Sequence, residues 1–437
     1  MKKYLPLPLI ILLGIIILTA LHRGGISFQA HLAWMVLLLP LLVFVYRDTK
    51  NKGQKIPSLV TGAILLFILS IIIGWSNSLM KDFGIISVTG LLSGVATLLI
   101  VIQMEITDTI THRFLKTLAI FTTLLAVLGI ILYLGTPIDR LASTFTHLPF
   151  FTSSYPNAFA LLILSILPYT LIEFGKIENI RSWNREKIAL FSISTILISS
   201  LFLTFSRGAF IVFALIIVVL LLAKKIKLNK ALASLAITTI LLVTIIQIAR
   251  PNSVPTNEFG KKLTLSAGEK SSSVSERRDF WEGARGMIKE RPLTGFGPDT
   301  FRYAFPHYQK VPMANSDHPH NMMLKHAAEF GVPSTLLYLG IIFTALLLGW
   351  KFGRKNELTF SILIASSAII AHNMIDFNLN FASTAAIFWT FLGLLISQSL
   401  EKISIKKSAL TPKRIVICLY MLIVGVLFIG GMYEIYQ

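Results

Sequence analysis

Cysteine and charged side chains are both scarce in this sequence of 437 residues. Cys418 is the only cysteine, so no disulfide can form within the chain. Charged residues make up 14% of the sequence, whereas soluble globular proteins carry about 25%. Hydrophobic residues make up 54%. This balance argues against a set of soluble domains and favours a chain surrounded by membrane lipids.

Acidic residues are scarcer than basic ones, with 21 against 40 and a net charge of +19. A strongly basic chain is often a nucleic-acid-binding protein. Here much of the basic charge lies in short segments between apolar runs, as the positive-inside rule predicts for cytoplasmic loops. We therefore expect no nucleic-acid partner.

Thirteen apolar runs approach the ~20 residues that a helix needs to cross a bilayer. They lie at 5–21, 32–46, 57–75, 83–102, 115–134, 156–174, 188–206, 209–223, 231–248, 333–350, 358–375, 382–397 and 415–432. The first run is longer than the core of a signal peptide and has no clear cleavage site behind it, so we expect it to be retained. The pattern predicts an all-α polytopic membrane protein with about 12–13 transmembrane helices.

The basic residues also predict an orientation. With the N-terminus in the cytoplasm, the inner segments hold 24 lysines and arginines and the short outer loops hold four. The other twelve lie in one long segment, which the rule exempts. We expect an N-terminal transmembrane region (1–248), a loop on the outer face (249–330) and a C-terminal transmembrane region (331–437).

The outer loop is too long to be a mere connector. Residues 276–290 have helical periodicity, with apolar residues on one side: Phe280, Ala284, Met287 and Ile288. After a glycine-rich turn come four aromatic residues: Phe301, Tyr303, Phe305 and Tyr308. Their spacing suits anchoring at the membrane interface. A second helix is expected from Asn321 to Phe330, with a break at Gly331 before the next span.

Arg207 lies between two apolar runs and has no acidic residue within twenty positions on either side. The 36 residues from 188 to 223 are too many for one pass, so we expect two helices with a sharp turn at Gly208. An arginine so close to the bilayer usually has a functional partner. The alternative is an interfacial arginine that reaches lipid phosphate.

Two histidines lie where the loop returns to the membrane. His318 and His320 are candidate proton acceptors near neutral pH, and the alternative is a helix cap with incidental histidines. Asn321 either orients His320 or caps the following helix. With Asp317 the histidines also fit part of a zinc site, but the loop has no cysteine and no H-E-x-x-H pattern, so no metal is expected.

Three motifs at these positions resemble the O-antigen ligase and O-antigen polymerase superfamily, which includes protein O-oligosaccharyltransferases. They are Ser206-Arg207-Gly208, Arg277-x-x-x-Trp281 followed by Arg-Pro-Leu-Thr-Gly-Phe-Gly at 291–297, and His320-Asn321 followed, after nine intervening residues, by Gly331-Val332-Pro333-Ser334. The resemblance is best over residues 188–397. It implies a GT-C-type glycosyltransferase fold at the bacterial inner membrane, with one long periplasmic loop and no metal or cofactor.

The resemblance also implies the roles of the site residues. Arg207 and Arg277 would bind the pyrophosphate of an undecaprenyl-pyrophosphate-linked glycan donor, and Arg278 is the alternative to Arg277. His320 would take the proton of the acceptor hydroxyl, and a single displacement would invert the anomeric carbon. His318 and Asn321 are expected to bind substrate.

One further pair is expected at the substrate site. His372 and Asp376 lie four residues apart at the outer end of a span, which places them on one helix face. They either help to shape the acceptor site or satisfy each other between helices.

Alternatives within the enzyme class differ in the acceptor, which is lipid A-core for a ligase and another lipid-linked repeat for a polymerase. The spacing at His320 favours a ligase. Protein O-oligosaccharyltransferases often continue further after the last span than this sequence does. The alternative of another class is a flippase or transporter, but we find no internal repeat, and the unusual polar residues lie at the outer face rather than the midplane.

Overall fold

The structure, a computed structural model, describes residues 5–52, 58–78, 80–136, 138–147, 153–177, 184–250, 273–310 and 316–400. Within these ranges the chain is helical, as expected. Its apolar helices are α1 (Leu7–Leu21), α2 (Phe28–Lys52), α3 (Ser58–Ser76), α4 (Lys81–Ile102), α5 (Asp108–Gly135), α6 (Pro156–Gly175), α7 (Arg185–Leu203), α8 (Arg207–Leu222), α9 (Lys230–Ala249), α13 (Met322–Leu348), α14 (Glu357–Asn373) and α15 (Ala382–Leu400). Short helical turns η1 (Arg23–Gly25), η3 (Gly349–Gly353) and η4 (Asn378–Asn380) join some of them.

These helices confirm the predicted polytopic membrane protein. Seven of the described helices are long and apolar enough to cross a membrane, and five shorter apolar helices accompany them. The expected span at 415–432 lies outside the described residues.

The centre of the bundle is formed by α15, α6 and α4. The apolar window of α15 is fully buried and that of α6 is 89% buried, whereas that of α9 is only 28% buried. Trp389 of α15 packs directly on Gly94 of α4, where an added β-carbon would lie 2.1 Å from the indole nitrogen. Small residues let helices approach closely in a bilayer, where apolar burial alone gives no driving force. The outer surface of α9 is instead suited to contact with lipid tails.

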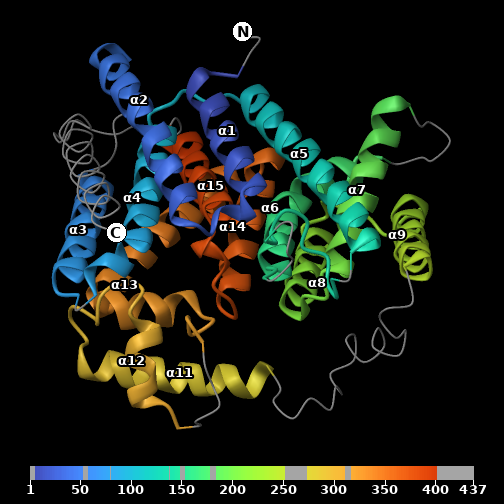
Figure 1. The fold of residues 1–437 in the computed structure, drawn as a ribbon. Coiled ribbons are helices and arrows are strands. Elements are labelled where there is room, and N and C mark those ends of the chain that lie inside the picture. Colours follow the sequence, from blue (N-terminus) through green and yellow to red (C-terminus); the bar gives the residue numbers. More distant parts are fainter. Residues whose placement is uncertain are drawn as a thin grey trace.

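Two amphipathic helices of the long loop, α11 (Ser273–Glu290) and α12 (Phe301–Tyr308), lie across the end of the bundle opposite the start of α1 (Figure 1). Phe280, Ala284 and Met287 of α11 form a small core with α12, which confirms the expected apolar face. The expected interfacial role of the aromatic residues is wrong for Phe301 and Phe305, which are 0% and 1% exposed. Four residues apart, they share the helix face that α11 covers.

A glycine turn docks these loop helices onto α13. Gly295 and Gly331 have φ angles of +67° and +84°, which residues with a side chain rarely adopt. The backbone N–H of Phe296 donates to the carbonyl of Ala328 at 3.0 Å. A β-carbon on Gly331 would lie 2.2 Å from the carbonyl oxygen of Leu293. The expected break at Gly331 is therefore observed as a kink within α13, made where two backbones cross.

The turn between α7 and α8 lies three residues earlier in the sequence than expected. Phe205 has the left-handed backbone, with φ of +48°, whereas Gly208 lies inside the first turn of α8. A β-carbon on Gly208 would lie 2.5 Å from the Cδ1 atom of Ile375. The expected turn at Gly208 is thus wrong, because this glycine allows a close helix contact rather than a change of chain direction.

Replacing Gly331 by alanine should destabilise the fold by about 1–3 kcal/mol, because the left-handed backbone and the contact with Leu293 both oppose a β-carbon. Thermal unfolding of the purified protein in detergent measures this. Gly340→Ala is the matched control in the same helix, since nothing lies within 4 Å of its added carbon. Equal melting temperatures for the two variants would contradict the docking role of Gly331.

Candidate functional site

His320 immediately precedes the helix cap of α13, and its imidazole contacts Asp376. The Nδ1 atom of His320 donates to Oδ1 of Asp376 at 3.4 Å. The His320 side chain is 24% exposed and the Asp376 side chain is 4% exposed. His320 also has a φ of +50°, a strained value for a residue with a side chain. An ionised carboxylate only accepts hydrogen bonds, so this contact fixes the proton on Nδ1 and leaves Nε2 as the basic nitrogen.

The Asp376 carboxyl is ionised despite its burial. Burial raises its pKa, but the hydrogen bond from His320 and the charges of His372 and His320 outweigh this effect. The pKa of Asp376 therefore lies below its ordinary value of 3.8. The group is a carboxylate throughout the physiological range.

Asp376 is also the end of a hydrogen-bonded chain that starts at an arginine. The side-chain amide of Asn157, at the start of α6, donates to Oδ2 of Asp376 at 2.7 Å. The guanidinium of Arg140 donates to Oδ1 of Asn157 at 2.6 Å and to the carbonyl oxygen of Thr204 at 2.7 Å. The start of α6, the end of α7 and the segment after α14 are thus joined by polar contacts.

Two further arginines act on Arg140. Burial lowers the pKa of Arg140, and the charge of Asp376 raises it. The positive charges of Arg207, at the start of α8, and Arg277, on α11, also lower this pKa, which is about 10 in total. Arg278 lies differently, because it is 82% exposed and pairs with Glu282 at 3.4 Å. Arg277 rather than Arg278 therefore belongs to this arginine cluster, which we define as Arg140, Arg207 and Arg277.

Asn321 is the N-cap of α13. Its Oδ1 atom accepts from the backbone N–H groups of Met323 and Leu324, both at 3.0 Å. Its amide also donates to the carbonyl of Met374 at 2.8 Å. The cap thus fixes the start of α13 against the segment that carries Asp376, which holds His320 in place.

His372 and Asp376 do not share a helix face, contrary to expectation. The helix α14 ends at Asn373, so Asp376 lies in the turn beyond it. The Nδ1 atom of His372 accepts from the amide of Asn378 at 3.0 Å, and its Nε2 atom lies 3.5 Å from the hydroxyl of Ser206. His372 therefore connects α14 to the turn before Arg207 instead of pairing with Asp376.

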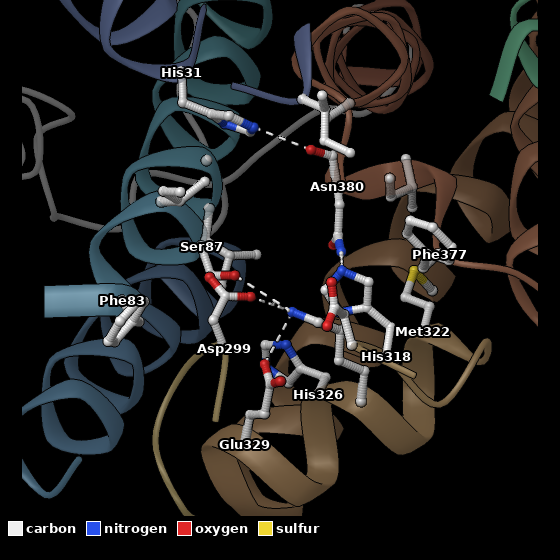
Figure 2. Close-up of a pocket in the computed structure, with 18 of the residues that line it drawn as sticks. His31, Phe83, Ser87, Asp299, His318, Met322, His326, Glu329, Phe377 and Asn380 are labelled. Atoms are coloured by element: carbon white, nitrogen blue, oxygen red, sulfur yellow. Dashed lines mark hydrogen bonds and ion pairs between the residues drawn. The ribbon is translucent and has the colours of Figure 1, made fainter. Parts of the chain in front are cut away.

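A cavity of about 680 Å³ borders His320 (Figure 2). Its wall comes from η1, α2, α4, α12, α13, α15 and the segments on either side of His320 and η4. His320 lines this cavity, whereas Arg207, Arg277 and Asp376 do not. His320 thus borders the cavity and also contacts the carboxylate linked to the arginine cluster.

His318 lies in the cavity wall rather than beside the arginine cluster. The amide of Asn380 donates to its Nε2 atom at 3.2 Å, and its ring packs against Phe377 with centroids 4.7 Å apart. Burial and, to a lesser degree, the charge of Lys325 lower the pKa of His318 to about 3. His318 is therefore a neutral hydrogen-bonding group in this site.

Residues 192–339 match a family model described as O-antigen ligase. This segment resembles the O-antigen ligase family, and we name it the O-antigen ligase domain after that resemblance. The matched residues include Arg207, Arg277 and His320, and the expected family is confirmed. No protein of curated function matches the chain.

Part of the site lies outside the O-antigen ligase domain. Arg140, Asn157 and Asp376 are not in the matched segment, and sequence analysis missed the first two as site residues. Their contacts join positions as much as 219 residues apart. The available signal was weak, namely a polar residue at the outer start of an apolar helix.

Replacing Asp376 by asparagine should remove a pH-dependent part of the stability. The folded pKa lies below the ordinary 3.8, so the carboxylate contributes stability that is fully present above about pH 4 and lost as the pH falls through the folded pKa. Thermal unfolding in nanodiscs between pH 7 and pH 3 measures it. The gap between wild type and Asp376→Asn should be constant near neutrality and shrink in acid. A gap that widens in acid would contradict the assigned ionisation.

Proposed function

We propose that this protein is an inverting glycosyltransferase of the O-antigen ligase type. It moves a glycan from undecaprenyl pyrophosphate to an acceptor hydroxyl, with lipid A-core as the acceptor, at the periplasmic face of the inner membrane. The observation that carries the proposal is the His320–Asp376 pair joined to a cluster of arginines from separate elements. The family match and the apolar helices support a membrane glycosyltransferase.

The arginine cluster suits a pyrophosphate leaving group. Guanidinium groups stay charged at any physiological pH and bind phosphate oxygens with paired hydrogen bonds. In this proposal Arg207 and Arg277 contact the pyrophosphate and offset the charge that grows on the leaving oxygen. Arg140 already donates to Asn157 and Thr204, so its part is to hold the cluster together.

His320 suits a general base. Its Nε2 atom takes the proton of the acceptor hydroxyl while that oxygen attacks the anomeric carbon. The bond from the anomeric carbon to the pyrophosphate oxygen breaks on the opposite side, which inverts the configuration and releases undecaprenyl pyrophosphate. Asp376 holds Nδ1 and stabilises the imidazolium, as carboxylates do behind other catalytic histidines.

The charge pattern supports a periplasmic site. Arg277 lies on α11, which together with α12 lies across the end of the bundle opposite the start of α1 (Figure 1). His320 directly precedes the cap of α13, and Asp376 lies just after the end of α14. The short loops predicted to lie outside hold few basic residues and the opposite loops hold many, so the positive-inside rule supports an outward-facing site.

Two other functions use the same geometry differently. A polymerase would use the same residues with a lipid-linked repeat as acceptor, and the ligase-like spacing after His320 favours the ligase. A flippase would place its polar groups near the bilayer midplane. The link between Asp376 and Arg140 lies instead in segments that flank helix ends, which favours transfer chemistry over transport.

His320→Ala should lower glycan transfer by about 10²–10⁴-fold, the usual contribution of a general base. The assay uses purified protein, lipid-linked oligosaccharide and either lipid A-core or a second lipid-linked repeat, and it scores both transfer and release of the pyrophosphate lipid. His307→Ala is the control, because His307 is exposed on α12 and should leave transfer unchanged.

Full activity of His320→Ala would contradict the proposed base. Transfer to the lipid-linked repeat alone would make the enzyme a polymerase. Transfer that stops when a chelator is added would contradict the metal-independent mechanism.

Arg277→Ala and Arg278→Ala form a matched pair of neighbouring substitutions. Arg277→Ala should reduce transfer by about 10²-fold or more, because it removes a cation that offsets leaving-group charge. Arg278→Ala should remain active, because it removes only an exposed pair with Glu282. The same transfer assay, with insertion checked by monodisperse elution in detergent, measures both. A greater loss for Arg278→Ala would exchange the roles.

A further inference from the structure

The cavity beside His320 differs in charge from the arginine cluster. Its described wall carries three basic and three acidic residues: Arg23, Arg302, Lys325, Asp299, Asp317 and Glu329. Arg302 and Asp317 pair with each other at 3.3 Å near the surface. The basic and acidic residues of the wall are therefore equal in number, and the wall has no excess of basic residues like that of the arginine cluster.

Three of these charges form a buried network at the side of the cavity (Figure 2). The Nζ atom of Lys325 lies 3.0 Å from Oδ1 of Asp299 and 3.0 Å from Oε2 of Glu329, and it donates to the hydroxyl of Ser87 at 3.4 Å. The Glu329 side chain is 0% exposed. Burying three charges is costly unless they are paired, and such groups beside a membrane are usually functional.

Several polar atoms of the wall have no hydrogen-bond partner within the described protein. Three of them are Oε1 of Glu329 and the Nδ1 atoms of His31 and His318, and Nε of Arg23 is another. His31 is 3% exposed, and its other ring nitrogen faces the carbonyl of Asn380 at 3.0 Å. Buried polar atoms nearly always have a partner. Hydroxyl groups, which both donate and accept, would satisfy all three atoms.

Aromatic rings form another part of the wall. Tyr155, Phe330, Tyr338, Phe377 and Trp389 all line the cavity. Apolar rings with a few convergent polar groups are typical of small-molecule sites, and about 680 Å³ lies within the usual range of roughly 300–1,000 Å³. A saccharide matches both parts, because its hydroxyl edge meets the polar groups and its C–H faces meet the rings.

We propose that this cavity binds an uncharged saccharide, the end of the acceptor whose hydroxyl is deprotonated by His320, and that Glu329, Lys325 and Asp299 select it. This inference rests on the proposed function, because it uses His320 as the base. In an inverting displacement the acceptor and the leaving group lie on opposite sides of the transferred sugar. The cavity, whose wall has equal numbers of basic and acidic residues, and the arginine cluster provide two such sides. His320 borders the cavity and contacts Asp376, which is linked to the cluster.

The test measures protection of a thiol in the cavity wall by defined glycosides. Ser27→Cys is made in a Cys418→Ser background, since Cys418 is the only native cysteine and Ser27 lines the cavity. The full chain in nanodiscs is modified with a small neutral methanethiosulfonate reagent. Methyl glucoside, methyl glucuronide and methyl glucosaminide serve as neutral, anionic and cationic probes of similar size. Ser76→Cys, exposed and outside the cavity, is the control thiol.

The neutral glycoside should slow modification at position 27, and the two charged glycosides should protect less, while position 76 is unaffected by any probe. Adding Glu329→Gln removes one negative charge from the wall. The concentration of neutral glycoside needed for protection should then rise roughly tenfold, because a hydrogen bond to a charged group is lost, and the glucuronide should gain protection. Equal protection by all three probes in the wild type, or an unchanged order in Glu329→Gln, would overturn the inference.

A second variant tests the same charge effect if Glu329→Gln folds poorly. Asp317→Asn removes a charge at the exposed mouth and should shift the preference toward the glucuronide in the same direction. Protection needs neither donor nor transfer. If the neutral glycoside does not protect the thiol at position 27 but transfer is lost in His320→Ala, this inference alone is overturned. If the neutral glycoside protects that thiol but His320→Ala still transfers glycan, the role of His320 as base is overturned and the saccharide site is not.

Discussion

The arrangement of the candidate site around His320 depends on one buried carboxylate. Asp376 accepts from His320 and from Asn157, and through Asn157 it is connected to Arg140. A buried charge without partners is strongly destabilising, so these contacts have to form together. Segments around residues 140, 157, 320 and 376, which are far apart in sequence, are thereby held in one register.

Close packing at glycines also fixes the relative positions of the segments that carry the site. Gly295 and Gly331 let the loop backbone cross α13 without side chains between them, which fixes α11 against α13 and therefore Arg277 against His320. Gly208 brings the first turn of α8 against Ile375, one residue before Asp376. The glycines of the three sequence motifs thus act through packing and the charged residues through electrostatics, and the motifs need both.

Local patterns allowed much of this fold to be predicted. Hydropathy gave the spans, the 3.6-residue period gave the buried face of α11, and isolation in an apolar stretch marked Arg207. Patterns of the same kind misplaced residues wherever the outcome depended on distant contacts. Spacing put His372 and Asp376 on one face, but α14 ends before Asp376. Neither the link from Arg140 to Asn157 nor the cavity has a local signature, because both are assembled from many elements.

The position of Asp376 also resolves an electrostatic conflict in the proposed reaction. A cluster of guanidinium groups favours a pyrophosphate but opposes the positive charge that His320 acquires when it takes a proton. The carboxylate contacts the imidazole directly and reaches the cluster through Asn157, so it offsets repulsion at the moment the proton arrives. Asp376 is therefore as much a part of the proposed chemistry as the residues that touch the substrates.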